Sequence, residues 1–300
     1  SSGYLLLLGS LLGTGYGFYW LAFNVLTFEI TEPETRDFFN GLLGTLSSAG
    51  GIIGPISAGF LITRFASDIG YTLIFTISLL LFAAAVFVSI LLKRRPAAGI
   101  YLFRRALKER KHNRDWQLVT NAHFMQGIRD GTFAFIISVF VFISTGSELA
   151  LGTFGLINSG IAFLAYTVAA RFIKKENRKK IMIFGGLLLY AAIFLIVFQV
   201  TYPRLLIYAS VIAVAYPLML VPYASMTYDV IGKSRNASEM RIEYVVVREV
   251  FLNAGRVVSV LAFITAVTLF DPVRSIPYFL LIIGCGHAVA ALMMKRTGTA

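Results

Sequence analysis

The stretch from Tyr71 to Leu92 reads YTLIFTISLLLFAAAVFVSILL and holds no charged residue. As a helix that rises about 1.5 Å per residue, it is long enough to cross a hydrocarbon core of about 30 Å. A membrane strand would need apolar and polar residues in alternation, which this stretch lacks. The stretch from Ile181 to Val200 has the same character. The sequence therefore predicts helices that cross a lipid bilayer.

The composition indicates that the chain as a whole lies in a membrane. Of the 300 residues, 57% are hydrophobic and 14% are charged, a balance that a water-soluble domain of this length does not have. The net charge is +12, but the Lys and Arg residues lie almost entirely in short gaps between apolar stretches. This placement is typical of topology signals and does not indicate a nucleic-acid partner. We expect an all-α, polytopic protein surrounded by membrane lipid.

The apolar stretches predict nine membrane spans. They lie at residues 4–28, 39–63, 71–92, 122–143, 150–171, 181–200, 203–229, 242–269 and 276–294. Lys and Arg concentrate in every second loop, whereas the other loops hold only Arg64, Arg204 and Arg274. By the positive-inside rule, the basic loops and the C-terminus are expected to be cytoplasmic and Ser1 outside. The predicted location is the cell membrane.

The longest connection, Lys93 to Asn121, divides three predicted spans from six. The first and seventh spans end in similar sequences, Thr27-Phe28-Glu29-Ile30 and Thr227-Tyr228-Asp229-Val230. Many transporters are built from repeated halves. We therefore expect a partial N-terminal half of three helices (1–94), a cytoplasmic basic linker (95–121) and a six-helix C-terminal half (122–300). If the two span ends correspond, three further spans precede Ser1.

The second predicted span carries a spaced pattern of small residues around one proline: Gly41, Gly50, Gly54, Pro55, Ala58 and Gly59. With this pattern the chain resembles the major facilitator superfamily, whose helices four to twelve would correspond to these spans. The resemblance implies a helical bundle of two pseudo-repeated halves, the first of them incomplete. In that family the pattern lies in helix five and is typical of antiporters, especially exporters. Small residues let helices approach closely, so a helix-packing contact is expected at Gly50, Gly54, Pro55 and Gly59, although any tightly packed membrane helix can show this pattern.

Charged side chains inside the membrane cost about 2.5 to 3.5 kcal/mol at a helix centre, so each needs a reason. Arg256 lies near the middle of the eighth span, with Asn253 one turn away. Its side chain is too short to bring the guanidinium to the membrane surface. We expect it to meet a partner on another helix, water or substrate. The two readings are a buried ion pair that orders the bundle and an arginine that binds an anion or acts in a gate.

Other candidates for a substrate cavity lie on three further spans. Arg129 and Asp130 lie about two turns into the fourth span, which corresponds to the family's cavity-lining helix seven, and a structural ion pair is the alternative reading. The aromatic candidates are Tyr16, Trp20, Tyr216 and Tyr223. Aromatic rings can stack on an organic or sugar-like solute. Core packing and interface anchoring are the competing explanations for them.

Charged residues recur at the cytoplasmic ends of two corresponding spans. Glu29 is followed by Arg36, and Asp229 is followed by Arg235 and Arg241. Similar pairs in the family latch the inner gate. We therefore expect Glu29 to pair with Arg36, and Asp229 to pair with Arg235 or Arg241. The alternative is a set of solvated ion pairs that contribute at most about 1 kcal/mol each.

These features predict a secondary active transporter that moves a small organic solute by alternating access, with efflux favoured over uptake. The alternative is a lipid or glycolipid flippase, or another envelope-assembly protein, on the same scaffold. We do not expect an enzyme, because the sequence has no zinc-ligand spacing, phosphate-binding glycine loop or nucleophile motif. The single cysteine, Cys285, and three scattered histidines do not indicate a metal site. No cofactor is expected, and the protein is expected to be monomeric.

Overall fold

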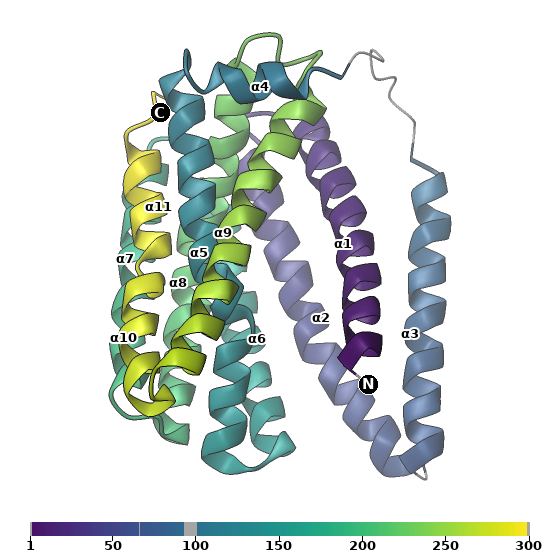
Figure 1. Ribbon diagram of the computed structural model, residues 1–300. Helices are drawn as coiled ribbons and strands as arrows, with labels where there is room; N and C mark the ends of the chain where they lie inside the picture. The colour runs from purple at the N-terminus through teal and green to yellow at the C-terminus, as the bar shows by residue number, and fades with distance from the viewer. Residues whose placement is uncertain (1, 66, 93–100, 299–300) are drawn as a thin grey trace.

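The computed structural model describes residues 2–65, 67–92 and 101–298, and these residues contain helices and no strands (Figure 1). The helices, in chain order, are α1 (Ser2–Ile30), α2 (Arg36–Arg64), α3 (Ser67–Ile90), α4 (Phe103–Glu109), α5 (Arg114–Thr145), α6 (Glu148–Phe172), α7 (Arg178–Val197), α8 (Tyr202–Lys233), α9 (Arg241–Leu269), α10 (Pro272–Gly284) and α11 (Gly286–Lys295). Within the described residues, eight helical segments are long and apolar enough to cross a membrane. The chain is therefore an all-α, multi-pass membrane protein.

Eight of the nine expected spans overlap these segments, and one does not. The span expected at 181–200 is α7, which is helical but is not one of the eight; its first turn holds three basic residues, Arg178, Lys179 and Lys180. The span expected at 276–294 is one of the eight segments, although its helix is interrupted at Cys285, where α10 ends and α11 begins. Gly286 lies at this break, and a Cβ there would collide with the backbone carbonyl of Met125 in α5. The break between α10 and α11 therefore lies where the chain packs directly against α5.

Residues 95–100 of the expected linker at 95–121 lie outside the described residues, and the rest of it is more ordered than the sequence indicates. It contains α4, and α5 begins at Arg114 rather than at residue 122. The Asn113 side chain caps α5 by accepting a hydrogen bond from the Trp116 backbone N–H, 3.0 Å away. The buried Trp116 indole N–H in turn donates to the Ala106 carbonyl of α4, at 3.0 Å. The second of these bonds ties α5 to α4, which lies across the end of the bundle (Figure 1).

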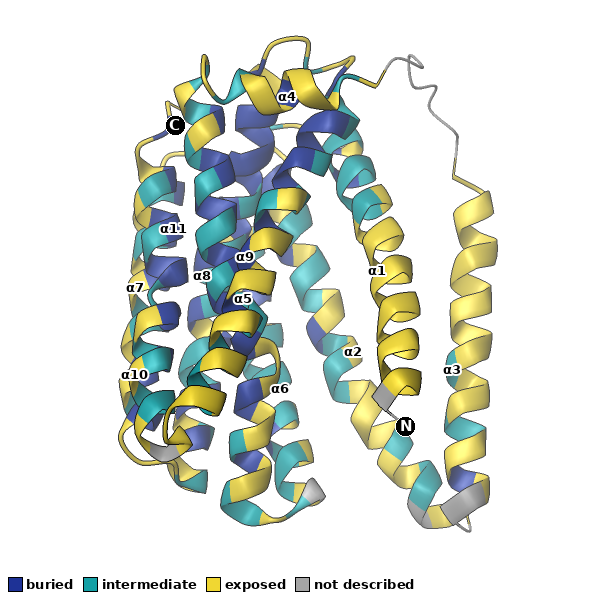
Figure 2. Cartoon of the chain, viewed as in Figure 1, coloured by how far each residue is buried: buried dark blue, intermediate teal, exposed yellow. Residues whose placement is uncertain are grey.

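The helices form two groups, which we call the N-terminal group (α1–α3) and the C-terminal group (α5–α11). Within the C-terminal group, α5 packs on α9 and α7 packs on α8, while α2 and α6 form the main contact between the groups. Buried residues concentrate in the C-terminal group, and most of α3 and the first half of α1 are exposed (Figure 2). One end of the molecule carries α4, the start of α7 and the C-terminus, and we call it the basic end (Figure 1).

Glycines set the closest approach of helices, though not at the positions expected in α2. A Cβ at Gly41 would lie 2.5 Å from the Ala170 Cβ of α6, and one at Gly51 would lie 2.6 Å from the Ser159 Oγ. By contrast, a Cβ at Gly50, Gly54 or Gly59 would meet nothing within 4 Å among the described residues. The helix contact expected at this motif, which includes Pro55 inside α2, is therefore not formed within the described chain. The reason is that α2 diverges from α6 beyond Gly51 and leans toward α3 (Figure 1).

Candidate functional site

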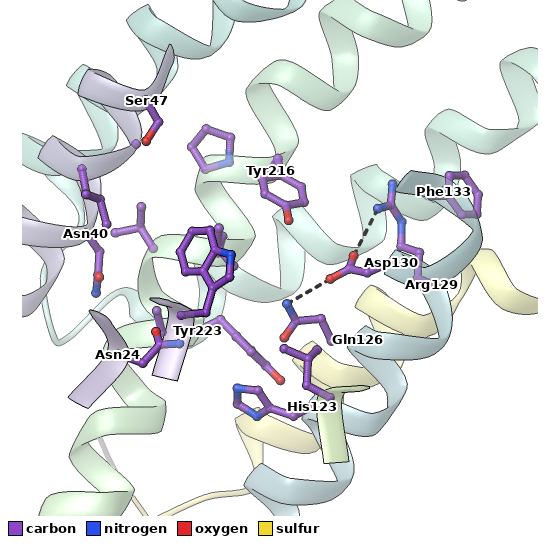
Figure 3. Close-up of a pocket in the computed structure, with 18 of the residues that line it drawn as sticks. Asn24, Asn40, Ser47, His123, Gln126, Arg129, Asp130, Phe133, Tyr216 and Tyr223 are labelled. Carbon is purple, nitrogen blue, oxygen red and sulfur yellow. Dashed lines mark hydrogen bonds and ion pairs between the residues drawn. The ribbon is translucent and has the colours of Figure 1, made fainter. Parts of the chain in front are cut away.

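A cavity of 1220 Å³ lies between the two groups of helices. Its walls come from α1 and α2 on one side and from α5, α6, α8 and α9 on the other. Amide side chains are spread over the wall, at Asn24, Asn40, Gln126, Asn158 and Asn253. Figure 3 labels Asn24, Asn40 and Gln126 among these residues and shows Gln126 joined to Asp130 by a dashed line. The size and the mixture of polar and aromatic groups suit a small organic solute with its water.

All eight residues that the sequence suggests for a substrate cavity line this cavity: Tyr16, Trp20, Arg129, Asp130, Tyr216, Tyr223, Asn253 and Arg256. They come from four helices, and the fold brings them together. Four polar atoms of wall residues are buried without a hydrogen-bond partner among the described residues: the Tyr223 hydroxyl, Gln126 Oε1, Arg129 Nε and Arg248 Nε. Unpartnered buried polar atoms are costly, so they are positions where a ligand or water gains a hydrogen bond. The role of the eight residues in binding stays a prediction.

Arg129 and Asp130 belong to one cluster of side chains at the cavity wall. Arg129 Nη1 lies 3.9 Å from Asp130 Oδ1, and its guanidinium carbon lies 4.5 Å from the centre of the Phe133 ring. Gln126 Nε2 donates to Asp130 Oδ2 at 3.2 Å (Figure 3). The other partner of Asp130 is His287 of α11, whose Nε2 lies 3.1 Å from Oδ1. The sequence did not point to His287, because it lies far along the chain beside Cys285.

Arg256 differs from the expected picture of a charge paired across helices. Its Nη1 donates to the Asn253 Oδ1 at 3.2 Å, on the same helix. The side chain is exposed and faces the cavity. About two turns from Arg256 toward the basic end, Glu249 pairs with Arg248 and accepts a hydrogen bond from Asn24 Nδ2 of α1, at 3.1 Å. The cavity wall of α9 thus carries two arginines. Arg248 has an acidic partner, Glu249, whereas Arg256 is hydrogen-bonded in the described chain only to the Asn253 amide.

A buried cluster of four charges joins the two groups at the basic end. Arg36, the first residue of α2, forms an ion pair with Asp229 of α8. Arg178, the first residue of α7, reaches Asp37 Oδ2 at 2.6 Å, Asp229 Oδ2 at 2.7 Å and the Pro33 carbonyl at 2.8 Å. These four side chains are at most 6% exposed. The formal charges of the two arginines and two aspartates sum to zero. Removing any one of the four charges therefore leaves a net charge buried in the cluster.

The gate residues therefore pair crosswise, and the expected pairing is wrong. Glu29 forms its ion pair with Arg241 rather than with Arg36, and Asp229 takes Arg36 rather than Arg235 or Arg241. Glu29 lies near the end of α1 and pairs with Arg241, the first residue of α9, which follows α8. Asp229 lies near the end of α8 and pairs with Arg36, the first residue of α2, which follows α1. This exchange is what two repeated halves produce when their equivalent ends meet across a pseudo-twofold axis.

The similar span ends also meet in space. The rings of Phe28 and Tyr228 lie 5.8 Å apart, and the Arg36 guanidinium lies 5.4 Å from the first and 6.0 Å from the second. The Tyr228 hydroxyl donates to Asn24 Oδ1 at 3.1 Å. The internal sequence echo thus marks a contact between the halves. The sequence does not single out Asp37 and Arg178, two members of the cluster, because they lie among other charges at helix starts.

Comparison with known proteins agrees with the sequence resemblance. The Major Facilitator Superfamily matches residues 1–241 of the chain. The chain is 57% identical over 291 residues to the uncharacterized protein YqgE of Bacillus subtilis (strain 168), which covers 97% of this chain and 68% of that protein. It is also 69% identical over 72 residues to an uncharacterized protein in the sodM 3' region of Geobacillus stearothermophilus, covering 24% of this chain and 34% of that protein. With its helical architecture and its membrane spans, the chain belongs to the Major Facilitator Superfamily of membrane transporters.

Proposed function

We propose that the protein is a secondary active transporter that moves a small organic solute by alternating access, with efflux as its direction. The observation that carries this proposal is the cavity of 1220 Å³ between two groups of helices that are bridged by ion pairs at the basic end. Rocking of the two groups would open that end and close the other. The amide groups on the cavity wall favour a water-soluble solute over the acyl chains of a lipid.

The ion pairs at the basic end act as a latch in this scheme. We define the latch as the pairs Glu29–Arg241, Arg36–Asp229 and Asp37–Arg178, each of which joins the N-terminal group to the C-terminal group. The Arg178–Asp229 contact lies within the C-terminal group, so it can persist when the groups separate. Opening therefore exchanges three inter-group pairs for water. Removing them should raise the population of the open state.

Cysteine accessibility tests this proposal directly. Thr27 lines the cavity near the basic end and is buried, and Cys285 is the single native cysteine. In a Cys285→Ser background, Thr27→Cys should react slowly with an impermeant maleimide applied at the basic end. Adding Glu29→Gln and Asp229→Asn should speed the reaction. If the two substitutions leave the labelling rate unchanged both in inside-out vesicles and in intact cells, the result would contradict the latch.

The direction of transport has its own test. The small-residue pattern around Gly54 and Pro55, typical of exporters in the family, is the feature that favours efflux. Cells that overproduce the protein should accumulate less of a transported dye than cells with an empty vector. Greater accumulation in the overproducing cells would establish uptake and overturn the proposed direction while leaving alternating access in place.

A further inference from the structure

The charged side chains that line the cavity do not balance. Three arginines and two acidic residues reach the wall, namely Arg129, Arg248, Arg256, Asp130 and Glu249. When the wall histidine, His123, is neutral, these five groups leave one excess positive charge. The contacts of the acidic residues determine which arginine carries it.

Both acidic residues on the wall already have a basic partner. Asp130 Oδ1 lies 3.9 Å from Arg129 Nη1, and Glu249 forms an ion pair with Arg248. The charge of Arg256 acts on Asp130 from a distance. In the part of the chain that the structure describes, however, no ion pair joins Arg256 to either carboxylate. Arg256 therefore carries the unpaired positive charge of the wall.

A neutral amide holds the Arg256 guanidinium in place. Asn253 Oδ1 accepts a hydrogen bond from Arg256 Nη1 at 3.2 Å, while Asn253 Nδ2 donates to the Glu249 backbone carbonyl at 2.9 Å. The second bond fixes the direction in which the amide oxygen points. The amide thus orients the guanidinium without neutralising it. The remaining N–H groups of Arg256 can form the paired hydrogen bonds that a carboxylate accepts, and Asn253 is a positioning residue for such a site.

Aromatic rings lie on the opposite wall of the cavity, on α1. Tyr16, Trp20 and Phe23 all line the cavity, and the side chains of Tyr16 and Trp20 are exposed to it. The Trp20 and Phe23 rings pack edge to face, with their centres 5.6 Å apart. Exposed rings of this kind bind a flat apolar body by stacking.

We propose that the cavity takes a small aromatic monocarboxylate, with its carboxylate at Arg256 and its ring against α1. A single negative charge balances the wall. A dianion leaves an excess negative charge in surroundings of low dielectric constant, and a cation adds to the excess positive charge. This inference rests on the proposed transport function and names its class of substrate.

Binding of small probes to the purified protein tests the charge of the solute. Benzoate is an aromatic monocarboxylate, and benzamide has nearly the same shape without the charge. At neutral pH a carboxylate is ionised. Isothermal titration calorimetry should therefore show benzoate bound at least about tenfold more tightly than benzamide, because hydrogen bonds between charged groups are the stronger ones. Phthalate, a dianion, and benzylamine, a cation, should bind more weakly than benzoate. Benzamide or benzylamine binding as tightly as benzoate would overturn the proposal.

Two variants assign this preference to Arg256. Arg256→Gln removes the charge and should make the affinities for benzoate and benzamide equal. Asn253→Asp keeps Arg256 but replaces the amide that lies 3.2 Å from Nη1 by a carboxylate, so it should also abolish the preference. Arg204→Gln is the matched control, because it removes an exposed arginine that does not line the cavity and should keep the preference. A preference that survives both cavity variants would refute the site, and Asn253→Asp decides the question if Arg256→Gln does not fold.

Two further probes test the body of the solute. Acetate has the carboxylate without the ring and should bind at least about tenfold more weakly than benzoate, because it buries less apolar surface. Trp20→Ala should reduce the affinity for benzoate and leave that for acetate unchanged. Equal affinities for acetate and benzoate would overturn the aromatic class. A short-chain phosphatidylglycerol that displaces benzoate at a lower concentration than unlabelled benzoate does would assign Arg256 to a lipid headgroup and also overturn it.

The maleimide assay at Thr27 separates this inference from the transport scheme, because the latch response does not depend on the charge of a solute. Equal binding of benzoate and benzamide together with an intact latch response would overturn the class of substrate and leave alternating access standing.

Discussion

The Asp37–Arg178 pair offers the sharpest test of the latch, because it joins the groups while Arg178 keeps a second partner. Arg178 donates to Asp37 at 2.6 Å and to Asp229 at 2.7 Å, in a cluster whose charges sum to zero. Asp37→Asn leaves the closed cluster with one excess positive charge, and Arg178→Gln leaves it with one excess negative charge. Breaking one side of a buried pair costs about 3 to 5 kcal/mol. Opening relieves this cost by admitting water.

The expected shift follows from that cost. Because about 1.4 kcal/mol corresponds to a factor of ten, even half of the lower figure predicts that either variant raises the open population at least about tenfold. The rate of maleimide labelling at Thr27→Cys, applied from the basic end, measures this population. Lys175→Gln is the matched control, because it removes an exposed charge from the loop next to Arg178 and should leave the rate unchanged.

The double variant decides whether the pair itself is responsible. Asp37→Asn with Arg178→Gln restores the formal balance of the cluster, leaving Arg36 paired with Asp229. Its labelling rate should therefore be lower than the product of the two single effects predicts, which is the signature of direct coupling. Strictly multiplicative effects would refute the reasoning. So would variants that lower the melting temperature while labelling at the wild-type rate, since the cluster would then be purely structural.

Three further outcomes follow from the cavity and the helix contacts. Arg256→Lys keeps the charge but loses the planar fork, so an anion-binding role predicts a strong loss of transport with a normal melting temperature; normal transport by both Arg256→Lys and Arg256→Gln would exclude that role. Gly127→Ala should destabilise the purified protein by about 1 to 3 kcal/mol in thermal unfolding, because its Cβ meets the Leu252 carbonyl, whereas Gly54→Ala should change little; equal melting temperatures would contradict this. Trp116→Phe removes the indole bond to α4 and should cost about 1 kcal/mol and speed proteolysis around α4; unchanged proteolysis would show that α4 is held by other contacts.

The latch shows how far helix-end charges could be interpreted from sequence. Glu29, Arg36, Asp229 and Arg241 were recognisable because acidic and basic residues recur at corresponding span ends. Their partners were not, since a charge can pair within its own half or across to the other, and both choices satisfy the same local spacing. The three-dimensional structure selects the crosswise pairs, and it adds Asp37 and Arg178 from helix starts that the sequence leaves unremarkable.

The small-residue pattern in α2 shows the opposite case, in which the residues identify the family but not the contact. The glycines were sufficient for the resemblance, and the described chain places its close α2–α6 contact at Gly41 and Gly51 instead of Gly54. Spacing along a helix determines which residues share a face. It does not determine how far a neighbouring helix follows that face before the two diverge.

The sequence by itself determined that this protein is a polytopic helical membrane protein, because uncharged stretches such as Tyr71 to Leu92 can satisfy their backbone hydrogen bonds in lipid only as helices. It also indicated which polar side chains lie at membrane depth, since a charge there is costly and conspicuous. Only the tertiary structure decided which of those side chains meet. The Asp130–His287 contact joins residues on helices far apart in the chain, and such contacts depend on how whole helices pack, which no local pattern of residues specifies.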